Sequence, residues 1–449
     1  MLSPAYLGNW KKIPRYKIQR VLKYIVVSCI LVICFIPGAS AAAPITYRHE
    51  HFIFQLDPDV YSWSGPSDQW VYNGQPVRPL SEWRVDGDEV PPLPAGVGQG
   101  SVTTWRRTEI TQTIREKISS VINREPGSVV IKRNASGSIM FEGVGLTGRQ
   151  VKIEEAVDLT LYALEHGLLD ITLPVAETQP EINVQDAELV SAGIQEVVTI
   201  GESNFAGSPN NRRHNIATGI SKFNGHLIPQ GEIFSFNKVL GPVEAATGFK
   251  LELVILGDRV EPQYGGGLCQ ISTTAYRGIW EYGFPIEQRR NHSFAVQYYA
   301  PQGTDATIYP PHTDMKFKND SPGDLLIQTH VEGDNAYYIF YGTRDDRKIE
   351  VIGPYTWGHA GPPADRIEYT TALPPGVTKK LGSQVSGMRA AWFRVLSDTP
   401  TQKASGTGEF IESVYSAYQS RPLFLQVGIA GPLPEPASPT WLGEAFTVE

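Results

Sequence analysis

The sequence predicts a multidomain α+β protein. Its 449 residues exceed what one ordinary hydrophobic core accommodates. Amphipathic helical patterns lie between residues 108 and 283, whereas beyond residue 348 only strand-like runs separated by turns remain. A hydrophobic content of 41% with 19% charged residues is that of a folded globular chain. We therefore expect an α+β N-terminal domain, an α+β central domain and a small all-β C-terminal module.

Residues 1–41 predict a secretory signal peptide. Six lysines and arginines precede residue 24 without any acid, and "YIVVSCILVICFI" and "ASA" follow them. We expect cleavage near Ala41 and export to the cell envelope; an uncleaved segment would instead anchor the protein in a membrane. Without these six residues the formal charge falls from −8 to −14 (−8 minus 6), which gives no electrostatic reason to bind nucleic acid.

The N-terminal domain is predicted at residues 44–184. Its first part, to residue 107, is rich in Trp, Pro and Gly and carries little periodic signal, so we expect irregular structure there. "TEITQTIREKISSVINRE" predicts a helix capped by Thr108, since its apolar residues share one face: Ile110, Ile114, Ile118, Val121 and Ile122.

Three further segments complete this domain. "GSVVIKRNASGSIMFEG" predicts two short strands around a turn. "IEEAVDLTLYALEHG" predicts a second helix that ends at Gly167 and directs Val157, Leu161 and Leu164 inward. The Pro-containing "LPVAETQPEI" is expected to be a connector to the next domain.

The central domain is predicted at residues 203–347. "NNRRHNIATGISKFNG" indicates a helix with Ile216, Ile220 and Phe223 in register, and "DLLIQTHVEGDNAYYIFYGT" indicates a hairpin turning at Gly333 and Asp334. Residues 348–430 then contain only strand candidates, and residues 431–449 are expected to be a tail.

The most informative segment is "YGGGLCQISTTAYRGIWEYG" at residues 264–283. Gly265, Gly266 and Gly267 suit a tight turn that presents backbone N–H groups. A helix follows, and its inward row is predicted to be Ile271, Ala275, Ile279 and Tyr282. Cys269 falls on the opposite face in the first helical turn, where unpaired N–H groups and the helix dipole lower the pKa of a thiol.

Cysteine usage also directs attention to this residue. Cys29 and Cys34 lie in the predicted signal peptide, so Cys269 is the single cysteine of the mature chain and no internal disulfide forms. Such a thiol is either reactive or a small buried hydrophobic residue.

A nucleophilic thiol needs a base. His292 in "RRNHSF" is the best candidate, and Asp305 in "GTDA" is the candidate to orient its imidazole. The simpler alternatives are a loop histidine and a turn aspartate. The N–H groups of the glycine turn and of the helix start could stabilise an oxyanion. Gln270 either helps to stabilise this oxyanion or only caps the helix.

Other kinds of site find less support. His49, Glu50 and His51 form "HEH", but no third metal ligand is apparent and the zincin spacing is absent, so we expect no metal. No phosphate loop or dinucleotide fingerprint is present, and we expect no cofactor. A pair of glycosidase carboxylates among Glu261, Asp305 and Asp314 cannot be judged without their separation.

The motifs "NGHLIPQGEIFSFNKVLGP", "GGGLCQISTTAY", "NHS", "GTDATI" and "DMKFKN" follow one another in the order typical of the VanW family, so residues 204–342 resemble that family. The resemblance implies an envelope protein, because the family is associated with glycopeptide-resistance gene clusters and some members are regarded as cysteine-dependent L,D-transpeptidases. It aligns Cys269 with the family cysteine and His292 with the family histidine. Further motif positions are Asn237, Gln270, Asp305, Asp314 and Asn319.

The flanking domains show weaker likenesses. By layout, the N-terminal domain resembles a small peptidoglycan-binding domain, and residues 348–430 resemble a five-glycine domain. Two hypotheses follow. The protein is either a cysteine acyltransferase that acts on peptidoglycan stem peptides through a Cys269 thioester, or a non-catalytic wall-binding or scaffold protein. A lone first-turn cysteine favours the enzyme, because a binding loop needs no thiol.

Overall fold

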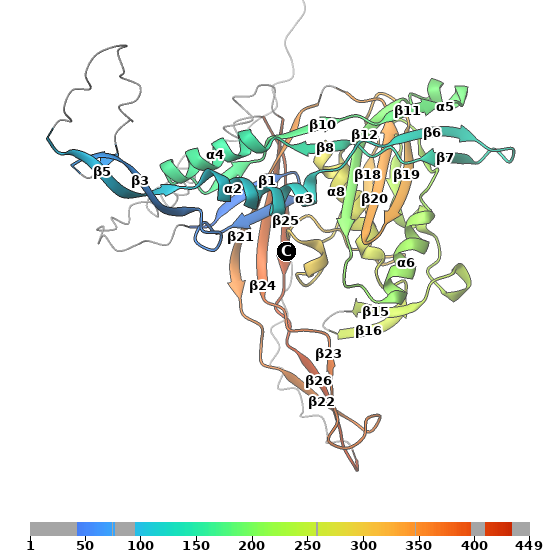
Figure 1. Ribbon diagram of the computed structural model, residues 1–449. Helices are drawn as coiled ribbons and strands as arrows, with labels where there is room; N and C mark the ends of the chain where they lie inside the picture. The colour runs from blue at the N-terminus through green and yellow to red at the C-terminus, as the bar shows by residue number, and fades with distance from the viewer. Residues whose placement is uncertain are drawn as a thin grey trace, which may run out of the picture. The chain divides into compact units, whose positions relative to one another are not determined.

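The computed structural model describes residues 43–73, 75–76, 95–256, 259–345, 347–396 and 409–432. From residue 44 onward, the described residues form a mixed α/β arrangement of many small sheets (Figure 1). The predicted signal peptide lies outside the described residues, as does the predicted tail after residue 432. Within the described ranges, no helix is long and apolar enough to cross a membrane.

The segment expected to be irregular contains strands. β1 (Ile45–His49) pairs with β2 (Phe52–Leu56) and, in parallel, with β9 (Asp170–Thr172). β3 (Ser64–Tyr72) pairs with β4 (Gln75–Pro76) and β5 (Val97–Trp105). The expectation of irregular structure was therefore wrong. One partner of β1, the strand β9, lies more than a hundred residues along the chain, and such pairing leaves no local periodicity to read.

The predicted connector is also made of strands. β10 (Val175–Thr178) pairs with β8 (Gly148–Val151), and β11 (Glu181–Val184) pairs with β6 (Ser128–Arg133). β6 and β7 (Ile139–Gly143) form the predicted hairpin. A short helix, α5 (Ala187–Ser191), follows β11.

The first predicted helix consists of three pieces: α2 (Arg107–Ile114), a wider π turn (Arg115–Ser119) and α3 (Ser120–Ile122). Its buried row is Ile110, Ile114, Ile118 and Ile122, whereas Val121 is 55% exposed, contrary to prediction. The wider turn keeps residues spaced by four in line, so Ile122 continues the row. The Thr108 cap is wrong too, because Arg106 precedes the first helical residue. α4 (Ile153–His166) ends at Gly167, as predicted.

The central part contains a sheet in the order β12-β20-β19-β13. β19 (Leu325–Glu332) and β20 (Asn335–Gly342) are the predicted hairpin, flanked by β12 (Glu196–Asn204) and β13 (Leu227–Ile228). A second sheet combines β14 (Ile233–Ser235), β18 (Lys316–Lys318) and β17 (Ile286–Gln288). α6 (Asn210–Ser221) is the predicted helix, and Ile216, Ile220 and Phe223 are buried as expected. The remaining elements are α7 (Phe236–Leu240), β15 (Leu251–Leu256) and β16 (Arg259–Tyr264).

α8 (Leu268–Tyr282) lies at the centre of the largest hydrophobic cluster. The predicted inward row is buried, but so is nearly all of the opposite face. The helix also packs directly on β12 without intervening side chains, since a Cβ atom at Gly278 would lie 2.5 Å from the backbone nitrogen of Gly201. Cys269 therefore lies in the first turn of a helix that is buried on both faces.

This close packing predicts a stability effect. In Gly201→Ala, the new Cβ atom would lie 2.0 Å from the carbonyl oxygen of Thr274 in α8. We expect a loss of about 1–3 kcal/mol in the free energy of unfolding, because helix and strand must move apart. Denaturant unfolding measures it. The matched control is Gly361→Ala, which has open space and should stay within about 0.5 kcal/mol. Equal stability of the two variants would contradict the packing described.

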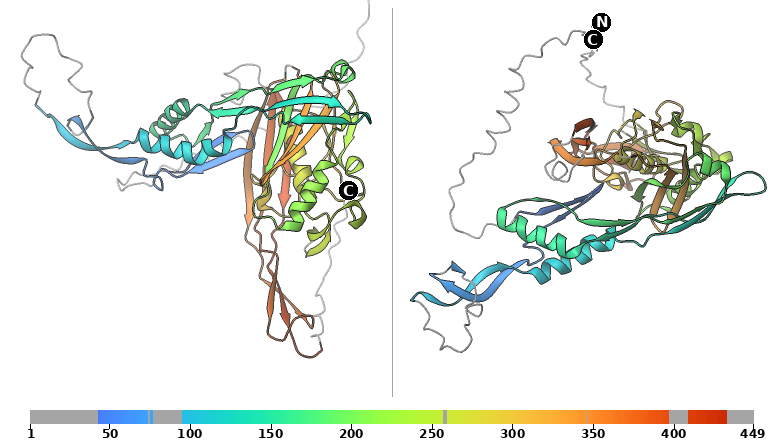
Figure 2. Two further views of the ribbon diagram at one scale, coloured as in Figure 1. Left: turned by 45° about the vertical axis from the view of Figure 1, so that its right-hand side comes forward. Right: turned by 90° about the horizontal axis from the view of Figure 1, so that it is seen from above.

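The C-terminal strands follow the prediction for residues 348–430. β21 (Ile349–Ala360), β24 (Gly387–Leu396) and β25 (Glu409–Tyr418) form one sheet. β22 (Arg366–Thr370), β26 (Phe424–Gly428) and β23 (Thr378–Leu381) form another, coloured orange to red beyond the ends of β21 and β24 (Figure 2). Trp392 and Val414 belong to the same hydrophobic cluster as α8, so the long strands share the central core. The predicted domain boundaries stay predictions.

Candidate active site

The glycine turn places Cys269 at the start of α8. Gly265 and Gly267 have φ values of 80° and 111°, which favour glycine, and Gly267 is the N-cap of the helix. A Cβ atom at Gly266 would lie 2.8 Å from that of Glu252. Within the described part of the chain, the N–H groups of Gly266, Gly267 and Cys269 donate to no protein acceptor. The turn therefore presents free donors beside a half-buried thiol.

His292 and Asp305 form a buried pair. The Nδ1 atom of His292 lies 2.5 Å from Oδ2 of Asp305, which also accepts the His292 backbone N–H at 2.7 Å. The imidazole stacks on the Tyr299 ring with 4.6 Å between centroids. His292 is 7% exposed and Asp305 1%. This arrangement fixes the ring orientation and leaves Nε2 for another partner.

The Cys269 thiol interacts with this imidazole. Burial alone would raise the pKa of Cys269, but the hydrogen bond with His292 and its charge lower it to about 7. Burial would lower the pKa of His292, yet Asp305 and Cys269 raise it to about 9. The Sγ atom also lies 3.4 Å from Oγ1 of Thr307 and 3.6 Å from the Ile308 carbonyl oxygen. Each group thus favours the charged form of the other, so the interaction promotes the thiolate and the imidazolium together.

This electrostatic arrangement predicts the pH dependence of thiol reactivity. Alkylation of native protein by iodoacetamide should rise with an apparent pKa of about 7, below the free value of about 8.5. Rates measured from pH 5 to pH 10 by intact mass test this. Labelling only after denaturation would indicate that Cys269 is an inert buried side chain.

The Asp305 carboxylate is held by groups that the sequence analysis missed. Arg289 Nη2 lies 3.3 Å from Oδ1, and the Tyr418 hydroxyl donates to the same oxygen. That hydroxyl also accepts the Gly303 N–H at 2.8 Å. Burial would raise the pKa of Asp305, but His292 and Arg289 hold it well below its ordinary range. Because Tyr418 belongs to β25, a C-terminal strand completes the support of this site.

Polar residues of α8 hold the segment that carries Asp305. Ser272 Oγ donates to the Ala306 carbonyl at 2.6 Å, and Thr273 Oγ1 accepts the Ala306 N–H at 3.0 Å. Arg277 donates to several carbonyls of the same segment, among them that of Thr304 at 3.4 Å. A Ser-Thr-Thr run within a helix predicted to belong to the core is the sequence signal that could have revealed this contact.

The remaining predicted residues lie in their own hydrogen-bond networks. Gln270 is buried, its amide nitrogen donating to Ser203 Oγ and its oxygen accepting from Arg212, both at 2.9 Å. Asn237 donates to the Thr313 carbonyl at 2.8 Å and, through its backbone, to Asp314 at 2.9 Å. Asn319 donates to the Ile228 and Gly323 carbonyls.

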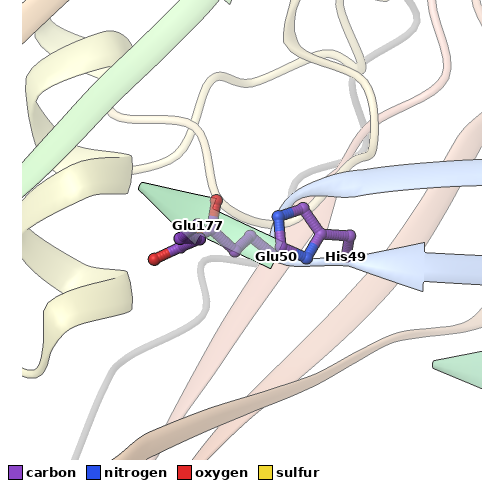
Figure 3. Close-up of side chains that lie close together, drawn as sticks. All are labelled: His49, Glu50 and Glu177. Atoms are coloured by element: carbon purple, nitrogen blue, oxygen red, sulfur yellow. The ribbon is translucent and has the colours of Figure 1, made fainter. Parts of the chain in front are cut away.

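The "HEH" motif gains carboxylate neighbours that its sequence did not reveal. Ligand atoms of His49, Glu50 and Glu177 lie within 4.8 Å of one another (Figure 3), and a second such group combines Glu50 with His51 and Glu281. A third potential ligand is thus present, contrary to the sequence analysis, because β10 brings Glu177 to the end of β1. Arg149 lies 3.7 Å from Glu50 and offsets part of this negative charge.

Fold and site together define a mixed α/β protein with a Cys–His–Asp cluster at the start of its central helix, in which the His and Asp are buried and the Cys is half-buried. Residues 211–341 match the family described as VanW like protein. The chain thus contains a VanW family region, which the match confines to residues 211–341. All three clustered residues fall inside it, and Tyr418 falls outside.

Two relatives match at low identity. The chain is 28% identical over 228 residues to "Uncharacterized protein YoaR" of Bacillus subtilis (strain 168), covering 51% of this chain and 73% of that protein. It is 29% identical over 144 residues to "Vancomycin B-type resistance protein VanW" of Enterococcus faecalis (strain ATCC 700802 / V583), covering 31% of this chain and 47% of that protein. No solved structure matches this chain.

Proposed function

We propose that this protein is a cysteine acyltransferase of the cell envelope, similar to an L,D-transpeptidase, which acts on peptidoglycan stem peptides through a Cys269 thioester. The observation that carries the proposal is the Cys269–His292–Asp305 geometry, with a thiol pKa of about 7 despite burial. A buried structural cysteine needs neither an oriented imidazole nor a lowered pKa.

The proposed reaction has two halves. The Cys269 thiolate attacks an amide carbonyl of a donor peptide, an Sγ–C bond forms, and the C–N bond breaks as the leaving amine takes the proton from His292. An acceptor amine then attacks the thioester, the C–S bond breaks, and His292 takes the proton of that amine. Hydrolysis replaces the acceptor amine with water.

The protein supplies donors for the negative charge of the intermediate. Free N–H groups at Gly266, Gly267 and Cys269 precede or begin α8, next to the thiol whose attack generates an oxyanion. Donors fixed in advance stabilise this charge without reorganisation. Asp305 keeps the imidazole in place and stabilises its charged form.

The substrate class is inferred from the family. One matching relative is described as a vancomycin resistance protein, and vancomycin resistance concerns the peptides of the cell wall. The basic, then apolar start of this sequence supports export. Sequencing the N-terminus of protein from the envelope fraction should find a start near residue 42. Protein that stays in the cytoplasm with Met1 intact would refute export.

Intact-mass measurement of a trapped acyl-enzyme tests the activity. Full-length protein is mixed with a panel of muropeptides and quenched in acid within seconds. We expect a mass increase equal to the donor acyl group, located at Cys269 by peptide mapping and absent from Cys269→Ala. If no muropeptide gives an adduct or a product while the protein still binds peptidoglycan, the non-catalytic wall-binding hypothesis is correct.

A further inference from the structure

A buried arginine beside the glycine turn lacks a negative partner. Arg212 in the first turn of α6 is 8% exposed. It donates to the neutral side chains of Ser208 at 2.5 Å and Gln270 at 2.9 Å. Its guanidinium carbon lies 4.1 Å from the Tyr298 ring centroid. Across the described ranges, no carboxylate forms an ion pair with it.

The other buried arginines have different partners, although Arg277 and Arg421 also pair with no acid in the described ranges. They either pair with an acid, as do Arg149, Arg289 and Arg394, or donate to backbone carbonyls, as do Arg277 and Arg421. Burying a charge without a counter-charge is costly. A site that holds such an unpaired positive charge is therefore suited to bind an incoming anion. The thiolate is not that anion, because its pKa is lowered by His292, Thr307 and Ile308.

Arg212 lies close to the reacting groups. A Cβ atom at Gly267 would be 2.9 Å from Cγ of Arg212, and Gln270, its hydrogen-bond partner, follows Cys269 directly. Tyr299 stacks on His292, and while burial raises the pKa of Tyr299, Arg212 is among the groups that lower it. The guanidinium and the imidazole thus both act on the same tyrosine.

The guanidinium retains donor capacity. It has five N–H donors, and Ser208 and Gln270 account for two hydrogen bonds. A carboxylate matches the remaining fork of donors in shape and charge. In a peptide, the terminal carboxylate belongs to the residue directly after the last amide carbonyl, and the Cα atoms of these two residues are about 3.8 Å apart.

We propose that Arg212 binds the free carboxylate of the residue that leaves during acylation, and so restricts donors to peptides attacked one residue before a free C-terminus. The inference rests on the proposed function, since it assigns a ligand to the leaving side of that site. The Sγ–C bond forms, the C–N bond breaks, and a single amino acid departs after its nitrogen takes the proton from His292. Its carboxylate stays charged throughout and takes no part in the bond changes.

Matched donor peptides test this assignment. Two muropeptides identical except for a C-terminal carboxylate or carboxamide are compared for acylation of Cys269 in the full-length protein. We expect the carboxylate peptide to react tenfold to a hundredfold more efficiently, the range for hydrogen bonds to a charged group. Arg212→Gln should abolish this preference, because acylation by the carboxylate peptide alone becomes less efficient, mainly through a higher KM. Arg212→Lys should restore part of the preference.

The neighbouring arginine is the control. Arg213 pairs with Asp334 instead, so Arg213→Gln should keep the preference for the carboxylate. If the wild type acylates both peptides equally well, Arg212 does not recognise a carboxylate, although the acyltransferase proposal stands. This comparison decides the question even if Arg212 variants fail to fold. If neither these peptides nor any other muropeptide gives an adduct, both proposals fall together.

Discussion

Replacing Cys269 with serine is expected to reduce acyl transfer by at least about a thousandfold, within the range seen when a member of a catalytic triad is removed. The hydroxyl nearly preserves the shape of the side chain, and Thr307 and Ile308 remain as neighbours. The serine hydroxyl does not ionise near neutral pH, whereas the thiol of Cys269 has a pKa of about 7. Turnover of muropeptides, measured as product release, gives the size of the loss.

Cys269→Ala is the companion variant and should lose activity fully. Both variants should keep wild-type circular dichroism and unfolding midpoints, because Cys269 is only half-buried. Wild-type activity in Cys269→Ser would rule out nucleophilic catalysis by the thiol. Loss of activity together with loss of the fold would indicate a structural role instead.

His292→Gln is expected to cause the second large loss of acyl-transfer activity, because it changes the ionisation of the Cys269 thiol. Burial raises the pKa of Cys269, and His292 is the main group that lowers it. Without the imidazole, the alkylation midpoint should move from about 7 to above the free value of about 8.5. Acyl transfer at pH 7 should fall about as far as in Cys269→Ser, because nucleophile and base act as a unit.

The double variant Cys269→Ser with His292→Gln should lose little beyond either single change. Asp305→Asn should cost less than His292→Gln, since it weakens the orientation of an imidazole that still stacks on Tyr299. If the alkylation midpoint of His292→Gln stays near 7, another group sets the pKa of the thiol and the triad assignment is wrong.

Local patterns in the sequence predicted several elements well. α4, α6 and α8 follow the spacing of apolar residues along one helical face, and β19 and β20 follow β-rich runs around Gly333. The ordered motifs also identified the family, and residues 211–341 match it. These features depend on neighbours within a few residues, which a sequence displays directly.

Long-range pairing was not predictable in the same way. β1 and β9 are adjacent in a sheet although more than a hundred residues separate them. Val121 was assigned to the buried face because an ideal helix was assumed. The π turn places Val121 outside that face, where its side chain is exposed. The burial of α8 on both faces depends on the contact of Gly201 with Gly278, which no local pattern marks.

The sequence by itself determined that the chain carries a single cysteine after its first 41 residues, that this cysteine begins a helix behind a glycine turn, and that His292 and Asp305 are the groups to consider beside it. Tertiary structure alone decided that the three side chains meet, that Tyr418 from β25 and Arg289 hold the carboxylate, and that Arg212 is buried without an acid. The physical reason is that pKa shifts, burial and ion pairing depend on distances through space, and residues far apart in sequence set those distances.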